Sequence, residues 1–170
     1  AEHLLASGHV SRGLDELRSV LGELGESIPK TPERALRSLL FHRHEQRDEG
    51  LEFHLQEESA IASRALHKLD VYQATSIGLI LVDNVRGADF QARSSLLAQR
   101  LGEPNRLLRC WVFEAIYRAQ EGAEGRASAE TFLAAVRPLA ASLATPRAHA
   151  YITLAEAFLE YYNGRFRRAV

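Results

Sequence analysis

Apolar residues recur every three or four positions along most of the chain, in stretches separated by short segments rich in glycine, proline and charged residues. The first stretch places Val10, Leu14, Leu17, Leu21 and Leu24 at steps of four, three, four and three. This spacing puts the five side chains on one side of an α-helix of roughly 15 residues. Because no alternating strand pattern bounded by hairpin turns competes with it, the sequence predicts an all-α fold.

A second helix is predicted from Thr31-Pro32-Glu33 to about Glu49. The threonine hydroxyl can cap the first free amides, proline suits the first helical position, and the acid lies near the positive end of the helix dipole. The apolar residues that this helix is expected to bury are Ala35, Leu36, Leu39 and Leu40. Gly50 closes the unit, and Leu51 to Glu58 has no clear period, so we expect a loop or a short irregular helix there.

The segment from Ser59 to about Arg86 again has helical spacing, and two interpretations of it are open. The stretch Asp70-Val71-Tyr72-Gln73 has the form of a capping box, which favours two helices broken at Leu69-Asp70. Without that break the segment is one long helix. A turn follows, in which Gly87 ends one helix and Asp89 caps the next. The residues assigned to this turn are Asp83, Arg86, Gly87, Asp89 and Phe90.

An internal repeat dominates the second half of the chain, because Leu97 to Gly122 returns 42 residues later as Leu139 to Gly164. The matching pairs are Leu97 and Leu139, Ala98 and Ala140, Leu101 and Leu143, Pro104 and Pro146, Glu114 and Glu156, Ala115 and Ala157, and Gly122 and Gly164. The inward-facing residues expected in this half are Leu107, Leu108, Trp111, Ala115, Ile116, Phe132, Val136, Leu139, Leu143, Leu154, Phe158 and Tyr161. Self-similarity at this period predicts a helical solenoid, whose hairpins bury their apolar faces on one another.

Glycines mark the expected hairpin turns at Gly8, Gly50, Gly87, Gly122 and Gly164, which lie 42, 37, 35 and 42 residues apart. These distances bracket the tetratricopeptide period and the longer helical repeats. We therefore expect residues 1–170 to form a single right-handed α-solenoid segment of about four tetratricopeptide-like hairpins. The first residues resemble the end of a helix and the last ones the start of another, so we expect a piece cut at both ends from a longer array.

Composition narrows the function classes. The 170 residues are 46% hydrophobic, which is enough for a sizeable core. The 21 basic and 22 acidic residues are interspersed, with a net charge of −1, so we expect neither a nucleic-acid nor a membrane partner. No apolar run is long enough to span a bilayer. The lone Cys110 excludes an internal disulfide and fits a reducing cytoplasm. A strong excess of arginine over lysine is typical of a GC-rich bacterial genome.

Candidate chemistry is sparse. His42, His44 and His54 suggest a metal site, but residues two apart on a helix point about 200° away from each other, so we expect solvated histidines. The acids and arginines of the turn at Asp83 are better explained as caps and ion pairs than as acid/base catalysts. Glu114 and Glu156 are expected to be solvated, or ion-paired across the groove between repeats. Motifs of nucleophilic catalysis, phosphate loops and dinucleotide fingerprints are absent, so the sequence predicts no catalytic residue, no metal and no cofactor.

The remaining candidate is a surface for protein recognition. Arrays of this kind curve, and the concave face formed by the first helix of each hairpin commonly holds a peptide or a partner helix. The polar residues expected on that face are Arg106, Arg109, Arg118 and His149.

The turn segment Val82-Asp83-Asn84-Val85-Arg86-Gly87-Ala88-Asp89-Phe90-Gln91-Ala92-Arg93, followed by Gly102-Glu103-Pro104, resembles a known family. It is similar to the tetratricopeptide-like C-terminal region of large bacterial serine/threonine protein kinases that carry a fused AAA-type ATPase module. The likeness extends to Gly8-His9-Val10 and Ile28-Pro29-Lys30-Thr31-Pro32 and so covers nearly the whole chain. The kinase signatures and the ATPase Walker motif are absent, so the resemblance implies a non-catalytic scaffold or sensor segment.

Three hypotheses follow from the sequence. The first is a cytoplasmic protein-interaction and regulatory segment of a multidomain signalling kinase. The second is the sensor array of an ATP-dependent transcriptional regulator, which uses similar repeats between an ATPase and a DNA-binding domain. The third, an enzyme that uses the histidines, requires a bound metal.

Overall fold

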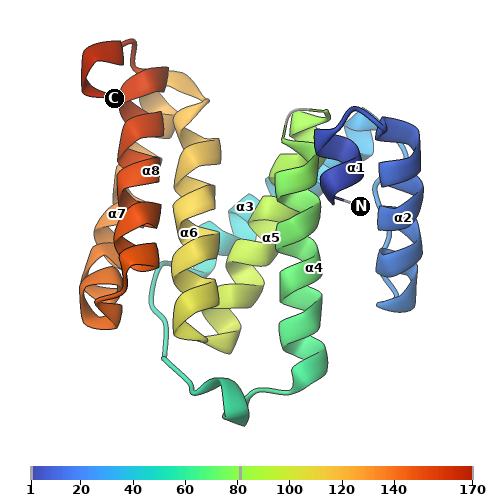
Figure 1. The fold of residues 1–170 in the computed structure, drawn as a ribbon, viewed down its shortest axis with the longest axis horizontal. Helices are drawn as coiled ribbons and strands as arrows, with labels where there is room; N and C mark the ends of the chain where they lie inside the picture. The colour runs from blue at the N-terminus through green and yellow to red at the C-terminus, as the bar shows by residue number, and fades with distance from the viewer. Residues whose placement is uncertain (1, 81, 170) are drawn as a thin grey trace. The chain divides into compact units, whose positions relative to one another are not determined.

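The computed structural model describes residues 2–80 and 82–169, whose regular elements are all helical (Figure 1). The α-helices are α1 (Glu2–Ala6), α2 (Val10–Glu23), α3 (Pro32–Glu49), α4 (Ser63–Leu79), α5 (Asn84–Leu101), α6 (Pro104–Ala119), α7 (Gly122–Leu143) and α8 (Pro146–Tyr162). Two short 3-10 helices, Glu58–Ala60 and Phe166–Arg168, complete them. The all-α class is confirmed. Among the described residues no helix has both the length and the apolar character needed to cross a bilayer.

The chain divides into two compact units. The first unit comprises residues 1–50 and 61–97, and the second comprises residues 51–60 and 98–170. Most of α5 therefore belongs to the first unit, and its last turn belongs to the second.

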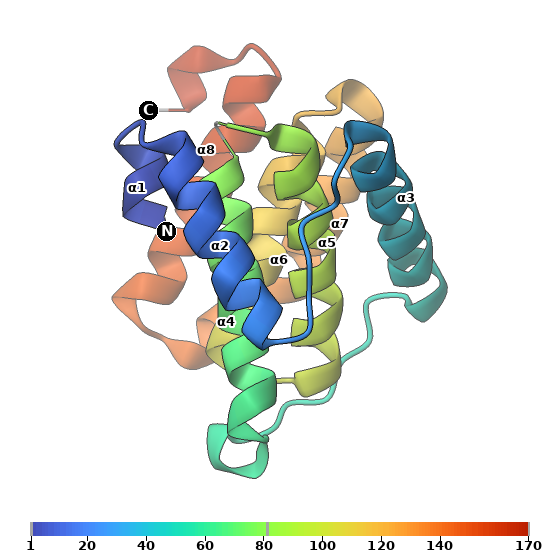
Figure 2. The same ribbon diagram turned by 90° about the vertical axis from the view of Figure 1, so that its right-hand side faces the viewer.

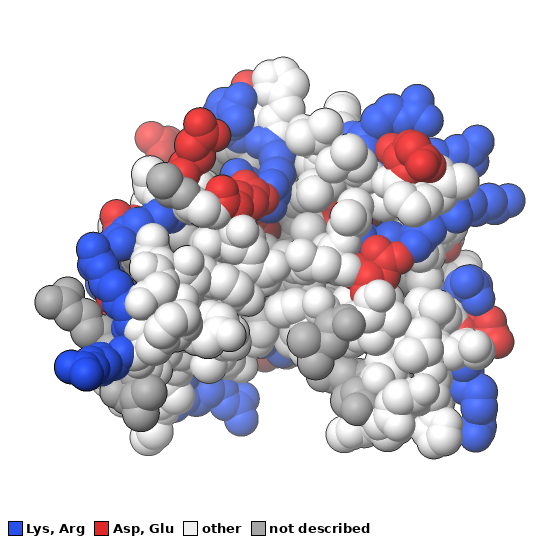
Figure 3. Space-filling model, turned by 90° about the horizontal axis from the view of Figure 1, so that it is seen from above, with Lys and Arg blue, Asp and Glu red and all other residues white. Residues whose placement is uncertain are grey.

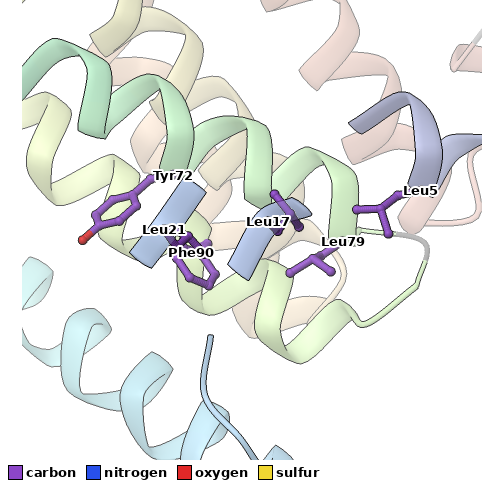
Figure 4. Packing of buried hydrophobic residues seen from close by; sticks show 6 residues of the cluster. All are labelled: Leu5, Leu17, Leu21, Tyr72, Leu79 and Phe90. Atoms are coloured by element: carbon purple, nitrogen blue, oxygen red, sulfur yellow. The ribbon is translucent and has the colours of Figure 1, made fainter. Parts of the chain in front are cut away.

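The first unit is built around an apolar cluster contributed by α1, α2, α4 and α5. The buried members are Leu5, Leu17, Leu21, Tyr72, Leu79 and Phe90 (Figure 4). Leu17 and Leu21 belong to the stripe predicted for α2, and Val10 and Leu14 pack against the same cluster. The helix predicted from Val10 is thus confirmed, together with its buried face. In Figure 2, α2 lies alongside α4, and α3 lies on the other side of α5.

Helix α3 begins as its sequence predicts. The Thr31 hydroxyl accepts a hydrogen bond of 3.3 Å from the Arg34 amide, Pro32 occupies the first helical turn, and Gly50 ends the helix with a φ of 67°. Its expected burial is wrong in part. Ala35 and Leu39 are buried, but Leu36 and Leu40 are 48% and 57% exposed. A helix packed along one narrow edge buries only the residues of that edge, and these two leucines lie beyond it.

Helix α4 runs unbroken through Leu69-Asp70, so the interpretation as two helices is wrong. Leu69 is fully buried in the middle of the helix, and packing of this face keeps the backbone helical across the capping-box sequence. The turn between α4 and α5 includes residues 80, 82 and 83.

The expected turn around Gly87 is therefore misplaced. Gly87, Asp89 and Phe90 lie inside α5 and are buried. The cap is Asp83, whose Oδ1 accepts a hydrogen bond of 3.1 Å from the amide of Arg86. Asp89 cannot cap the helix, because its carboxylate is buried in ion pairs. The other expected turn glycines, Gly8, Gly50, Gly122 and Gly164, all lie at helix ends and have positive φ.

In the second unit, α6, α7 and α8 contact one another. Trp111 of α6 is completely buried and meets Phe132 of α7 and Phe53 edge to face, each with 5.4 Å between ring centroids. The other residues predicted to face inward on α6, Leu107, Leu108, Ala115 and Ile116, are also buried. On α7, Phe132, Val136 and Leu139 are buried as predicted.

The helix boundaries of this half follow the 42-residue spacing. α5 ends at Leu101 and α7 at Leu143, and the next residue of each connection, Gly102 or Ala144, has a positive φ of 68° or 50°. Both α6 and α8 then begin on a proline. Two connections with similar sequence thus have the same backbone geometry.

An extended segment, residues 51–57, packs on the second unit and ends in the 3-10 turn Glu58–Ala60, as the absence of a clear period predicted. The side-chain amide of Gln99 donates to the backbone carbonyl of Glu52 at 2.9 Å, and the backbone amide of Gln56 donates to the backbone carbonyl of Gly102 at 2.9 Å. We call residues 51–57 the strap. It is fastened through its own backbone, and a Cβ atom on Gly102 would lie 1.8 Å from the His54 carbonyl oxygen.

Candidate functional site

The densest cluster of charged groups in the first unit joins α3, α4, α5 and the loop after α2. We call it the charge network; its members are Glu26, Ser38, His42, Lys68, Tyr72, Asp89 and Arg93. The sequence suggested an acid/base cluster around Asp83, but the structure gathers these groups from segments as far apart in the sequence as Glu26 and Arg93.

Asp89 is the most deeply buried member, with a fully covered side chain. Its Oδ2 lies 2.8 Å from Nη2 of Arg93, and its Oδ1 lies 3.2 Å from Nδ1 of His42. A buried carboxylate without partners would be strongly destabilising, and these two contacts supply a partner for each of its oxygens. The contact between Asp89 and His42 links α5 to α3.

His42 is oriented by two acceptors on the same ring nitrogen. Nδ1 lies 2.8 Å from the Ser38 carbonyl oxygen and 3.2 Å from Oδ1 of Asp89, so this nitrogen carries a proton and donates it. Ser38 Oγ lies 3.4 Å from the same Nδ1. A catalytic Ser-His-Asp relay needs the serine and the acid on opposite ring nitrogens. These three residues therefore do not form a nucleophilic triad, and their arrangement positions α3.

Arg93 connects the two sides of the charge network. Its guanidinium donates to Ser38 Oγ at 2.9 Å, lies 4.9 Å from the centroid of the Phe90 ring and is 3.7 Å from Glu26. Glu26 is in turn 2.5 Å from the Lys68 ammonium. The loop after α2 is thereby bound to both α4 and α5.

These contacts shift the titration of three groups. Burial acts to raise the pKa of Glu26, but hydrogen bonds from Lys68 and Tyr72 and the charges of Lys68 and Arg93 outweigh it and lower that pKa. The hydrogen bond with Glu26 raises the pKa of Lys68. Burial is the main cause of the raised pKa of Tyr72. All three shifts favour the protonation states found at neutral pH.

Arg86 holds the α2–α3 connection from the same side of α5. It donates to the Pro29 carbonyl at 2.7 Å and to the Lys30 carbonyl at 3.0 Å, and it forms an ion pair with Asp83. Arg86 and Arg93 are seven residues apart, so both lie on one face of the helix. Together they fix where α3 begins and how it lies on α5.

A second, uncharged network lies between α4 and α5. Gln73 donates to Gln91 at 3.3 Å, Ser76 donates to Gln91 at 3.2 Å, and Ser94 donates to Gln73 at 3.2 Å. All four side chains are at most 1% exposed. Buried polar groups that satisfy one another fix the register of two helices more strictly than apolar contacts do. The apolar pattern did not predict this network, although polar residues three apart on two consecutive helices indicate it in the sequence.

The residues predicted to bind a partner lie on two contacting helices, with Arg106, Arg109 and Arg118 on α6 and His149 on α8. Arg106 is 3.2 Å from Glu103 and 3.4 Å from Glu58. His149 is exposed, and its Nδ1 lies 2.9 Å from the Thr145 carbonyl oxygen. Arg109 is half-buried. Partner binding by these four residues stays a prediction.

Arg118 has a well-defined place inside the second unit. Its Nε donates to Oε1 of Glu114 at 2.7 Å, and its guanidinium lies 5.6 Å from the centroid of the Phe132 ring. Glu156, the repeat equivalent of Glu114, is exposed and pairs with Arg137 at 2.9 Å. Glu156 is thus ion-paired between α8 and α7, as expected, whereas Glu114 is buried and paired within its own helix, so the expected pairing across the groove between repeats is wrong for it.

Glu103 is the cap of α6 and is only 3% exposed. Its carboxylate accepts hydrogen bonds from the amides of Asn105 and Arg106, at 3.1 and 2.8 Å. Burial acts to raise its pKa, but these backbone donors outweigh burial and lower it. No local pattern predicted this cap, because glutamate is an uncommon residue at that position.

In the described part of the chain no group of three or more histidine, cysteine or acidic side chains is placed to hold a metal ion. His42 belongs to the charge network, and His44 lies 3.4 Å from Asp48 on the exposed side of α3. On the face shown in Figure 3, lysine and arginine are interspersed with acidic side chains. Comparison with family models, curated proteins and solved structures finds no match for this chain.

Proposed function

We propose that the chain is a non-catalytic protein-interaction and regulatory segment, folded as an α-solenoid of tetratricopeptide-like hairpins. The observation that supports this most is the packing of α8. This helix contacts both members of the preceding hairpin, α6 and α7, as expected when each hairpin completes its core with the next one. The recurrence of helix ends and left-handed residues at the 42-residue spacing supports the same conclusion.

The chemistry of the described side chains also supports a binding role. Their buried polar groups are used in contacts that hold helices together, as in the charge network and the glutamine and serine network. Such networks give a helical array a fixed geometry, which a scaffold needs in order to present a constant surface. We further propose, from the resemblance, that the parent protein is a bacterial cytoplasmic serine/threonine kinase with an AAA-type ATPase module.

The coding sequence and a binding experiment test this proposal together. A kinase domain encoded upstream supports it, whereas a helix-turn-helix domain encoded downstream favours a transcriptional regulator. The parent protein, with Arg109 and His149 changed to alanine, is then used to recover partners from the cells that produce it. Arg147→Ala, at an exposed site on α8, is the matched control.

We expect the double variant to lose its partner and the control to keep it, while both retain the helical circular dichroism of the unchanged protein. Unchanged recovery with the double variant would remove this surface from the account. Metal-dependent turnover by the 170-residue chain itself would contradict the proposed function.

A further inference from the structure

Helix α8 carries an apolar stripe that the structure leaves open. Leu154 and Tyr161, which the sequence pattern predicts to face inward, are 38% and 53% exposed. Shifted back by 42 residues, the stripe Leu154, Phe158 and Tyr161 corresponds to Val112, Ile116 and Ala119 of α6. These three equivalents are at most 2% exposed. The same helical face is thus covered in one copy of the repeat and uncovered in the other.

The same helix also borders a hollow of about 720 Å³, which lies between α7 and α8 and is lined by residues other than those of the stripe. Ala134 and Arg137 of α7 line it, together with Thr153, Ala157 and Glu160 of α8. Thr153 occupies the repeat position of Trp111, which packs against Phe132 in the preceding pair. Because threonine is much smaller than tryptophan, a helix seated here would need a large apolar side chain of its own to fill the space.

Two positions of this helix carry a different pair of charges in the two copies of the repeat. In α6, Arg118 binds Glu114 one turn earlier. The equivalent residues of α8 are Glu160 and Glu156, two acids at a spacing where like charges repel. Arg137 compensates Glu156 at 2.9 Å.

Glu160 is compensated less well. Its ion-pair partner is Arg165, whose Nη1 lies 3.7 Å from Oε1. Its other oxygen, Oε2, is buried and has no hydrogen-bond partner among the described residues. Such an oxygen favours an incoming cation that can reach it.

We propose that the hollow between α7 and α8, which we call the α7–α8 groove, binds an amphipathic helix of a partner protein. This helix carries a large apolar residue at the level of Thr153 and a lysine or arginine at the level of Glu160. Because those two groove positions are seven residues apart, the apolar and basic residues of the partner lie two helical turns apart as well. The inference rests on the proposed interaction function and adds a second surface, whose lining residues do not include Arg109 or His149.

Two labelled synthetic helices serve as probes, one made of leucine and lysine and its counterpart made of leucine and glutamate. Fluorescence anisotropy measures their binding to the 170-residue chain, and amide chemical shifts locate the site. We expect the lysine peptide to bind about tenfold more tightly than the glutamate peptide and to shift the amides of Ala134, Thr153 and Ala157.

Three variants complete the test. Glu160→Lys is expected to weaken the lysine peptide about tenfold, while Glu16→Lys, the same charge change at an exposed site on α2, changes its binding less than about twofold. Ala134→Trp fills the groove and is expected to weaken binding of the lysine peptide about tenfold. Ala134 is exposed, so this variant keeps the fold, which circular dichroism checks.

Equal effects of Glu160→Lys and Glu16→Lys, equal binding of the two peptides, or shifts confined to other helices would each overturn the inference. A dimer of the unchanged chain that Ala134→Trp dissolves would also overturn it, because a second copy would then occupy the groove. If neither peptide binds but the Arg109 and His149 variant still loses its partner, the proposed binding role of the α7–α8 groove is wrong and the proposed function stands.

Discussion

Because the strap packs directly against Gly102, adding a single methyl group at this position should have the largest effect on stability. Gly102 has a φ of 68°, and so any other residue there pays a left-handed backbone strain of about 1 kcal/mol. Gly122 has a φ of 77° and belongs to the same unit, but its added Cβ would meet no described atom within 4 Å. Gly122→Ala therefore measures the backbone strain alone.

Gly102→Ala adds a steric conflict to that strain. Its Cβ would lie 1.8 Å from the His54 carbonyl oxygen, and so the strap has to move away. That movement breaks the hydrogen bonds from Gln56 and Gln99, at about 1 kcal/mol each, and separates Phe53 from Trp111, at about 1 kcal/mol more. We expect Gly102→Ala to lower the free energy of unfolding by about 4 kcal/mol and Gly122→Ala by about 1 kcal/mol.

Urea unfolding followed by tryptophan fluorescence measures both variants. Trp111 is the chain's one tryptophan and is fully buried against the strap, so release of the strap should also shift its emission to longer wavelength before unfolding begins. If the two variants are equally destabilised and share the emission spectrum of the unchanged protein, the strap does not contribute to stability and the reasoning fails.

Four further substitutions test the networks and caps. Asp89→Ala leaves Arg93 without its buried partner and should lower the free energy of unfolding by about 3 kcal/mol; a loss below about 1 kcal/mol in urea unfolding would show that the charge network contributes little. Glu103→Ala should destabilise the chain by about 2 kcal/mol and Thr145→Ala by about 1 kcal/mol, because Glu103 caps two buried amides; thermal unfolding that gives the opposite order would refute this. The lowered pKa of Glu26 means that its contribution is present above the unfolded value near 4.5 and is lost as the pH falls through the folded one, so Glu26→Gln should cost up to about 1 kcal/mol at neutral pH and progressively less as the pH falls below 4.5; a pH-independent difference would contradict it.

Local signals predicted the helix starts well. Thr31-Pro32 and the prolines that open α6 and α8 act within one turn of the chain, through a side-chain cap and a fixed φ, so no distant contact is needed to interpret them. The apolar stripe of α2 was equally readable, because its spacing alone defines one buried face.

Features that depend on distant contacts were not predictable in this way. Asp83 and Asp89 both had the chemistry of a helix cap, and the choice between them is made by His42, which binds Asp89 from another helix. The stripe on α8 had the pattern of a buried face, but periodicity does not reveal whether another element covers it. The cross-helix pairing of Gln73 with Gln91 likewise depends on how α4 and α5 are aligned.

A crystal structure of the chain that superimposes successive hairpins tests the central claim, that the helix pairs form one right-handed array. The account predicts that the rotation and translation that carry α4 onto α6 also carry α6 onto α8, with the same hand, as in any solenoid with a constant step. Two unrelated transformations, or steps of opposite hand, would contradict it.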